Sequence, residues 1–282
     1  MSESIFEVTF RKYANILSEN TSSKMELTDE QNIALKILYI IIRDCLEDIY
    51  YEARREKINN KNCESKFPKF LEKYQPKNPY IKTYNYETLK LELPSTIKDC
   101  FKDLRDEINI KIVSKDKPIM NAGKGVISKA GLSRHDKTDE ILGFYFRFDI
   151  LLDDFNELKA GLQHELQHIH MRGTVNGLRN GQDKFRGFID YLGDKAEICA
   201  YAKEYAYRYH KKYPRDSVLS VDKLKKLFSN PKWESFNNYM LFGEDESVIK
   251  DKQDVTNADI KKMRKIHNEF VDMVKMSLRY YL

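Results

Sequence analysis

Residues 142–169 read LGFYFRFDILLDDFNELKAGLQHELQHI, and this stretch decides the fold that we expect. Its first part alternates apolar and polar residues from Leu142 to Ile150, which is the period of a half-buried β-strand. Its second part places apolar residues at the helical steps of three and four, namely Leu158, Leu162, Leu166 and Ile169. The stretch therefore predicts a strand followed closely by an amphipathic helix.

Capping residues mark the start of this helix and of one other. Asp153 or Asp154 is expected to cap the helix, which should run to about Met171. Near the start of the chain, Thr28 is followed three residues later by Gln31, which is the pattern of a capping box. We therefore expect a second amphipathic helix to begin after Thr28.

The helix after the strand carries the pentapeptide His164-Glu165-Leu166-Gln167-His168. On a helix, His164 and His168 lie one turn apart on the same face, so both imidazoles can bind one zinc ion at about 2.0–2.1 Å. Glu165 is rotated by about 100° around the helix from His164. From there it can accept a proton from a water molecule that the metal activates. The motif predicts a metal site; the competing interpretation is two ordinary histidines without a metal.

Glu197 is the candidate for a third ligand, because a catalytic zinc uses three protein ligands and keeps one position open. It lies on the next helix, which we expect to run unbroken over about residues 188–213. Three alanines surround it, and a carboxylate among small apolar residues is costly to bury unless it is paired or binds a metal. The alternative is a solvated carboxylate. Asp194, one turn earlier, is a second candidate ligand or a hydrogen-bond partner of a ligating histidine.

The motif helix and the segment Glu197-Ile198-Cys199-Ala200-Tyr201 together resemble the gluzincin zinc peptidases, especially small phage-encoded or bacterial members. The resemblance covers about residues 141–208. It implies a zincin-like core and a Zn²⁺ cofactor held by His164, His168 and Glu197. It also implies Glu165 as general base and acid, with a peptide or protein as substrate.

Two further roles follow from the resemblance. The strand 142–150 would be an edge strand that pairs with extended substrate, and an ordinary half-buried strand is the alternative. A Tyr or His donor would stabilise the oxyanion of the tetrahedral intermediate. Tyr201 is the first candidate, with Tyr205 and His210 behind it. Each of these three side chains could instead be a packed aromatic.

The whole chain is expected to be α+β and predominantly helical, with a small β-sheet beside the motif helix. Strands are expected at 108–113, 125–132 and 142–150, and helices at 221–228, 233–241 and 258–281. Residues 59–80 read as a loop or linker, and residues 243–257 as an exposed loop. We expect a helical N-terminal region and linker at 1–80, the metallopeptidase core at 81–215, and a C-terminal helical region at 216–282.

Composition excludes several classes of protein. The 41% hydrophobic and 33% charged residues are typical of a folded globular chain, and the longest apolar run is too short to span a bilayer. The net charge of +5 is too small to argue for nucleic-acid binding. The basic run 261–265 is interpreted as a solvent-exposed helix face. Four scattered cysteines and the lack of a secretory signal pattern favour a cytoplasmic protein, in a host cell if phage-encoded.

Two other functions stay open on the sequence. The first is a regulatory protease of the ImmA/IrrE type, which cleaves a repressor, although no helix-turn-helix segment is evident. The second is a non-catalytic helical interaction or structural protein with a closed metal site. Such a site would need a fourth protein ligand, which Asp194 or His210 could supply.

Overall fold

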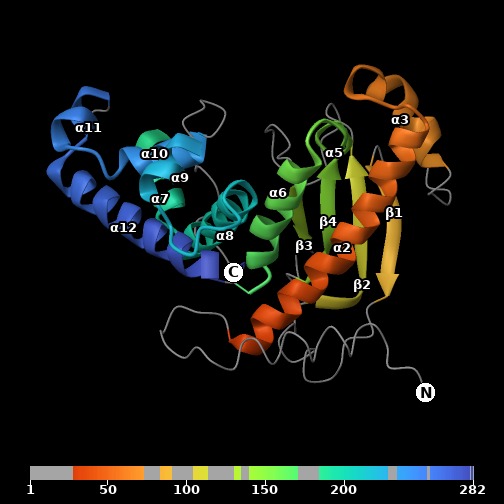
Figure 1. The fold of residues 1–282 in the computed structure, drawn as a ribbon, viewed down its shortest axis with the longest axis horizontal. Helices are drawn as coiled ribbons and strands as arrows, with labels where there is room; N and C mark the ends of the chain where they lie inside the picture. Colours follow the sequence, from red (N-terminus) through yellow and green to blue (C-terminus); the bar gives the residue numbers. More distant parts are fainter. Residues whose placement is uncertain are drawn as a thin grey trace. The chain divides into compact units, whose positions relative to one another are not determined.

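The computed structural model describes residues 28–72, 83–90, 104–113, 130–134, 140–170, 184–227, 234–252, 255–279 and 281. These residues form many helices and one small sheet, which confirms the predicted helix-rich α+β class (Figure 1). Among the helices of this described part, none is long and apolar enough to cross a lipid bilayer. The chain divides into an N-terminal unit, Met1–His170, and a C-terminal unit, Met171–Leu282. The boundaries predicted at 80/81 and 215/216 each fall within one of these units.

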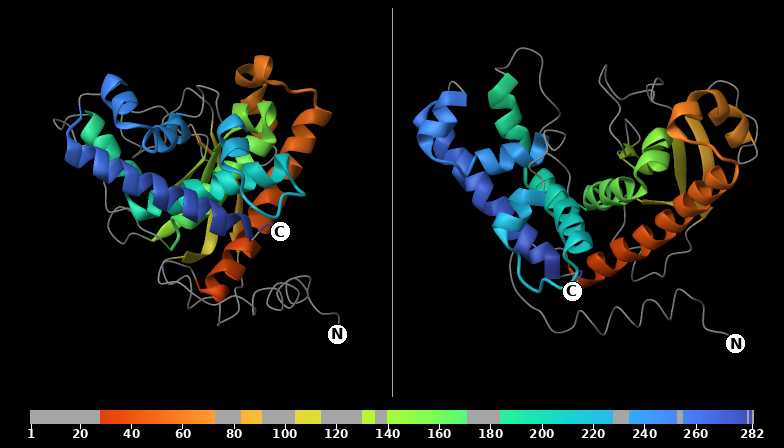
Figure 2. Two further views of the ribbon diagram at one scale, coloured as in Figure 1. Left: turned by 60° about the vertical axis from the view of Figure 1, so that its left-hand side comes forward. Right: turned by 45° about the horizontal axis from the view of Figure 1, so that its top comes forward.

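The N-terminal unit packs helices against a four-stranded sheet. Its elements are α2 (Asp29–Arg55), η1 (Asn60–Asn62), α3 (Cys63–Glu72), β1 (Thr83–Lys90), β2 (Leu104–Val113), β3 (Ala130–Arg134), β4 (Ile141–Arg147), α5 (Phe148–Asp153) and α6 (Phe155–Gln167). Helices α2 and α6 contact each other and cover one face of the sheet (Figures 1 and 2). The core between them and the sheet holds Leu38, Ile42, Ile110, Phe144 and Leu162.

The strands are ordered β1-β2-β4-β3. β1 pairs antiparallel with β2, β2 pairs parallel with β4, and β4 pairs antiparallel with β3. β4 is therefore an interior strand, and the expectation that residues 142–150 form an edge strand is wrong. The edge beside α6 is β3, which corresponds to the end of the strand predicted at 125–132; residues 125–129 lie outside the described part of the chain.

The strand predicted at 142–150 also ends early, because α5 begins at Phe148. The side chain of Arg147 pairs with Asp149 at this junction. Phe148 is completely buried and packs against Phe67 and Phe70, with ring centroids 4.6 and 5.4 Å apart. Phe148 thus continues the apolar alternation of the strand while its backbone is already helical, which explains the error.

Helix α2 begins where its local sequence predicts. Thr28 and Gln31 form the predicted capping box, in which each backbone N–H is bound by the other residue's side chain. Residues 59–72, by contrast, were expected in a linker and instead form η1 and α3. Asn59 caps η1, and the completely or almost completely buried Phe67, Phe70 and Leu71 attach α3 to the core despite Pro68 inside the helix. Burial of these side chains outweighs the helix-breaking tendency of proline.

The C-terminal unit contains only helices among its described residues. They are α7 (Lys184–Leu192), α8 (Lys195–Lys212), α9 (Val221–Leu227), α10 (Glu234–Leu241), α11 (Glu246–Lys252) and α12 (Asn257–Arg279). α8 packs along α12, where the ring of Tyr205 in α8 meets that of Phe270 in α12 edge-on. Tyr239 of α10 stacks on the same Phe270 ring, with ring centroids 4.1 Å apart. α11 lies where an exposed loop was expected over 243–257. Among its described residues α11 has one fully buried apolar residue, Ile249, and a single such residue cannot produce the repeating apolar pattern by which a helix is predicted.

Candidate metal centre

The helix that carries the motif is α6, and its ends are defined by specific contacts. Asp154 is the N-cap: its side chain accepts a hydrogen bond from the Glu157 N–H at 3.0 Å. The helix ends at Gln167 with His168 as C-cap, three to four residues before the predicted end at Met171. The N–H of His168 bonds to the Glu165 carbonyl, three residues back, so the last turn is tightened. The two motif histidines therefore occupy the last turn and the C-cap.

This position is electrostatically suited to a cation. The last carbonyl groups of a helix have no intrahelical partner and carry the negative end of the helix dipole. His164 is 8% exposed, while His168 is half-buried. A metal ion bound by both would lie at the end of α6 where positive charge is favoured.

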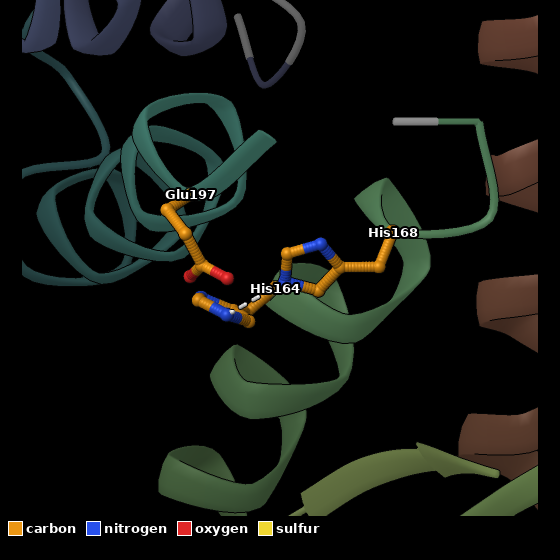
Figure 3. A group of neighbouring side chains, drawn as sticks. All are labelled: His164, His168 and Glu197. Atoms are coloured by element: carbon orange, nitrogen blue, oxygen red, sulfur yellow. Dashed lines mark hydrogen bonds between the residues drawn. The ribbon is translucent and has the colours of Figure 1, made fainter. Parts of the chain in front are cut away.

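The two imidazoles are placed as ligands of one ion would be. The Nε2 atoms of His164 and His168 lie 3.2 Å apart, and the rings are inclined at 67° (Figure 3). Two atoms each about 2.1 Å from one tetrahedral zinc ion lie about 3.4 Å from each other. The observed separation agrees with that value. It also permits a hydrogen bond between the two rings when no metal is bound, if one ring donates and the other accepts.

Glu197 is the third member of the group. One ligand atom from each of His164, His168 and Glu197 lies within 4.8 Å of the other two, so the three could hold a metal ion (Figure 3). Two imidazole nitrogens and one carboxylate oxygen form a donor set that zinc accepts in catalytic sites. Neither Asp194 nor His210 belongs to a group of this kind among the residues described.

Glu165 faces the edge strand. Its Oε2 accepts a hydrogen bond from the backbone N–H of Leu132 in β3 at 3.1 Å. It is not a member of the ligand group. The motif thus separates two nitrogen donors from one carboxylate, as the 100° rotation between consecutive helical residues predicts.

The helix expected over 188–213 is two helices, and this correction changes the role of Asp194. Gly193 and Asp194 separate α7 from α8, and Asp194 is the N-cap of α8, with its Oδ1 accepting from the Ala196 N–H at 2.8 Å. The cap explains the buried position of this carboxylate. Glu197 lies in the first turn of α8, three residues later.

Tyr191 is a neighbour of Glu197 that the sequence did not identify. Its hydroxyl group is hydrogen-bonded to the side chains of Glu197 and Tyr201, and burial, followed by these two groups, raises the pKa of Tyr191 well above its usual value. In one unbroken helix, Tyr191 and Glu197 would be rotated by about 240° from each other. Only the break at Gly193 brings them together, so no periodicity could have revealed the contact.

The three oxyanion candidates differ in their surroundings. Tyr201 is half-buried, stacks on Tyr205 and meets the ring of Tyr239 edge-on. Tyr205 is 2% exposed and is part of the aromatic core. His210 stacks on Tyr281 at the other end of α8, and burial lowers its pKa. Tyr201 alone of the three is near Glu197 through the shared contact with Tyr191.

Comparison of the chain with protein-family models, with curated proteins and with solved structures found no match.

Proposed function

We propose that the protein is a zinc-dependent peptidase with a zincin-like core. The observation that carries the proposal is the 3.2 Å separation of the His164 and His168 Nε2 atoms at the end of α6, with Glu165 turned away from them. In this proposal Glu197 is the third ligand and Glu165 the general base. The resemblance to the gluzincins supports the same assignment. A zinc ion bound there would supply a Lewis acid that activates water and polarises a carbonyl group.

The residues of the chain would divide the remaining work. Glu165 would accept the proton of the attacking water and pass it to the leaving amine. Tyr201 would donate a hydrogen bond to the oxygen that becomes negatively charged in the transition state. An extended peptide would be held by main-chain hydrogen bonds of an edge strand, at positions of β3 other than Leu132, whose N–H already donates to Glu165.

A structural metal site is the second candidate. A closed, structural zinc site requires four protein ligands. Within the described residues, the group contains three, and both side chains considered as a fourth, Asp194 and His210, lie outside it. This donor count favours the catalytic interpretation. A repressor-cleaving protease of the ImmA/IrrE type would use the same chemistry and differ in its substrate.

Elemental analysis tests the metal site directly. We expect about one zinc per chain in the wild type, and its loss in His164→Ala and His168→Ala. Glu197→Gln should bind zinc more weakly, because one charged ligand is replaced by a neutral amide. A wild-type protein that contains no zinc after zinc is supplied and the excess removed would refute the proposal.

Glu165→Gln separates catalysis from structure. It should keep its zinc and lose nearly all hydrolysis of unfolded polypeptides, measured as new amino termini. Glu47→Gln is a matched control, because it makes the same chemical change on α2 at a side chain that is 33% exposed. It should keep both zinc and activity. Equal behaviour of the two variants would favour the structural metal site.

A further inference from the structure

The edge strand β3 contacts α6 at three consecutive positions, all within the N-terminal unit. At the first position Gly161 faces Ala130: a β-carbon on Gly161 would lie 3.5 Å, an ordinary contact distance, from that of Ala130. At the second, the Leu132 N–H donates to Oε2 of Glu165 at 3.1 Å. At the third, Nη2 of Arg134 donates to the His168 carbonyl at 2.6 Å.

The spacing of these contacts follows from the geometry of the two elements. Residues 130, 132 and 134 are alternate residues of β3, so their side chains lie on one face and their N–H groups point the same way in the plane of the sheet. Four residues of strand span about 13 Å. Residues 161, 165 and 168 lie on one face of α6, and seven residues of helix span about 10.5 Å. The strand and the helix, which run side by side, therefore come into contact at similar intervals along their lengths. Two of the three contacts involve residues of the metal motif.

Arg134 binds the backbone at the residue where α6 ends. The His168 carbonyl belongs to the C-cap, at the end of α6 where carbonyl groups can accept hydrogen bonds from outside the helix. A guanidinium group that donates to it satisfies the carbonyl and fixes the main chain of His168. Because the imidazole of His168 is carried by this main chain, the contact also limits where its Nε2 can lie relative to that of His164.

We propose that β3 is a positioning strand for the metal motif: Arg134 places His168 for metal binding, and the Leu132 N–H places the carboxylate of Glu165. The inference rests on the proposed function, since it assigns these contacts a purpose at that site. Neither Arg134 nor Leu132 is itself one of the three candidate metal ligands. Losing an outer contact of this kind costs about 10- to 100-fold in metal affinity or activity.

The sign of the effect distinguishes positioning from simple charge. Arg134 is positively charged, so if it acted on a nearby metal ion only by repulsion, its removal would tighten metal binding. If it positions His168, its removal weakens binding. Arg134→Gln should therefore bind zinc about 10- to 100-fold more weakly than the wild type. Arg134→Lys, which keeps a charged donor, should recover part of the loss.

Zinc affinity is measured by competition with a chelating indicator. The matched control is Arg54→Gln, because Arg54 also donates a guanidinium hydrogen bond to a helix-terminal carbonyl, that of Leu152 in α5, at 3.3 Å. The control should keep wild-type affinity. Unchanged or tighter binding by Arg134→Gln would overturn the inference while leaving the proposed function intact. A wild type without zinc affinity would instead overturn the proposed function.

A second pair of variants tests the Glu165 contact and does not depend on the folding of Arg134→Gln. Leu132→Pro removes the leucine side chain and the outward-facing N–H, at a position where an edge strand tolerates proline. Leu132→Ala removes the leucine side chain and keeps the N–H. The proline variant should keep its zinc affinity and lose about tenfold or more in kcat. The alanine variant, which keeps the N–H, should retain a higher kcat than the proline variant. Equal kcat in the two variants would show that the N–H does not position the carboxylate.

Discussion

The backbone of Gly143 in β4 passes so close to Asn109 in β2 that a β-carbon on residue 143 would lie 2.0 Å from the Asn109 carbonyl oxygen. The backbone of Gly143 also has φ at +149°, in a region that residues other than glycine rarely adopt. The register of the parallel β2–β4 pair shifts at Asn109. Glycine is therefore required where the central strands come into register.

Gly143→Ala should destabilise the protein by about 2 kcal/mol or more, because the new methyl group meets backbone that has little freedom to move. Gly161→Ala is the contrasting change. It lies inside α6 at ordinary contact distance from Ala130, so it should stabilise by about 0.5–1 kcal/mol through helix propensity. Urea unfolding followed by circular dichroism measures both. A loss of stability in Gly161→Ala equal to that in Gly143→Ala would contradict the packing described for β4.

Tyr201→Phe should lower kcat by about 10²- to 10³-fold and leave the zinc content unchanged, because only a donor to the transition state is removed. Tyr205→Phe is the control, since Tyr205 is buried in the aromatic core one turn along the same helix. It should alter stability more than turnover. Steady-state kinetics with a cleavable peptide and elemental analysis of each variant give the comparison. Full turnover by Tyr201→Phe would remove this side chain from the mechanism.

Asp216 should make the stability of the C-terminal unit depend on pH. Its carboxylate accepts from Lys223 at 2.8 Å and from the buried Tyr209 hydroxyl at 2.7 Å, and these two bonds, that of Lys223 first, lower the pKa of Asp216. A lowered pKa contributes stability that is complete above the unfolded value of about 3.9 and is lost as pH falls through the folded value. Asp216→Asn removes this contribution.

Thermal unfolding at several pH values tests the sign. The wild type should exceed Asp216→Asn in melting temperature near pH 7, and the difference should shrink as pH falls below about 4. Asp222→Asn, the same change on an exposed side chain of α9, should show no such trend. A difference that grows with acidity would mean that Asp216 is not held as the anion by these partners.

Cys199 should be inert toward thiol reagents in the folded protein. It is 5% exposed in α8, and burial raises its pKa to about 11, so little thiolate forms near neutral pH. The wild type and Cys199→Ala should therefore show equal numbers of reactive thiols when native. In denaturant the variant should show one fewer. A difference between them in the native state would indicate that this part of α8 opens.

Signals that act over a few residues predicted the structure well. The capping box of Thr28 with Gln31 was predicted, and Asp154 was one of the two residues predicted to cap α6, because a cap depends only on a side chain and a backbone N–H three residues away. The same holds for the motif, since residues four apart on a helix must lie on one face. The 3.2 Å contact between its histidines follows from that spacing.

Features that depend on tertiary contacts were missed. The interior place of β4 depends on its pairing with β2, more than 30 residues earlier, and no alternation pattern reports which strands are neighbours. The sequence predicts one helix across Gly193 and Asp194 as a ligand or its partner, whereas in the structure Asp194 caps α8 after the break at Gly193. The contacts from Leu132 and Arg134 to α6 use a backbone N–H and an ordinary arginine, which carry no pattern at all.

The parallel pairing of β2 with β4 has a consequence for the rate at which the N-terminal unit folds. β3 lies within the connection between these two strands, so the chain must close a long loop before the central pair forms. We expect the contacts between β3 and the end of α6 to be completed together with that step, late in folding. An ion that requires them would stabilise the native state without assisting the transition state. Zinc should therefore slow unfolding of this unit and leave its refolding rate almost unchanged.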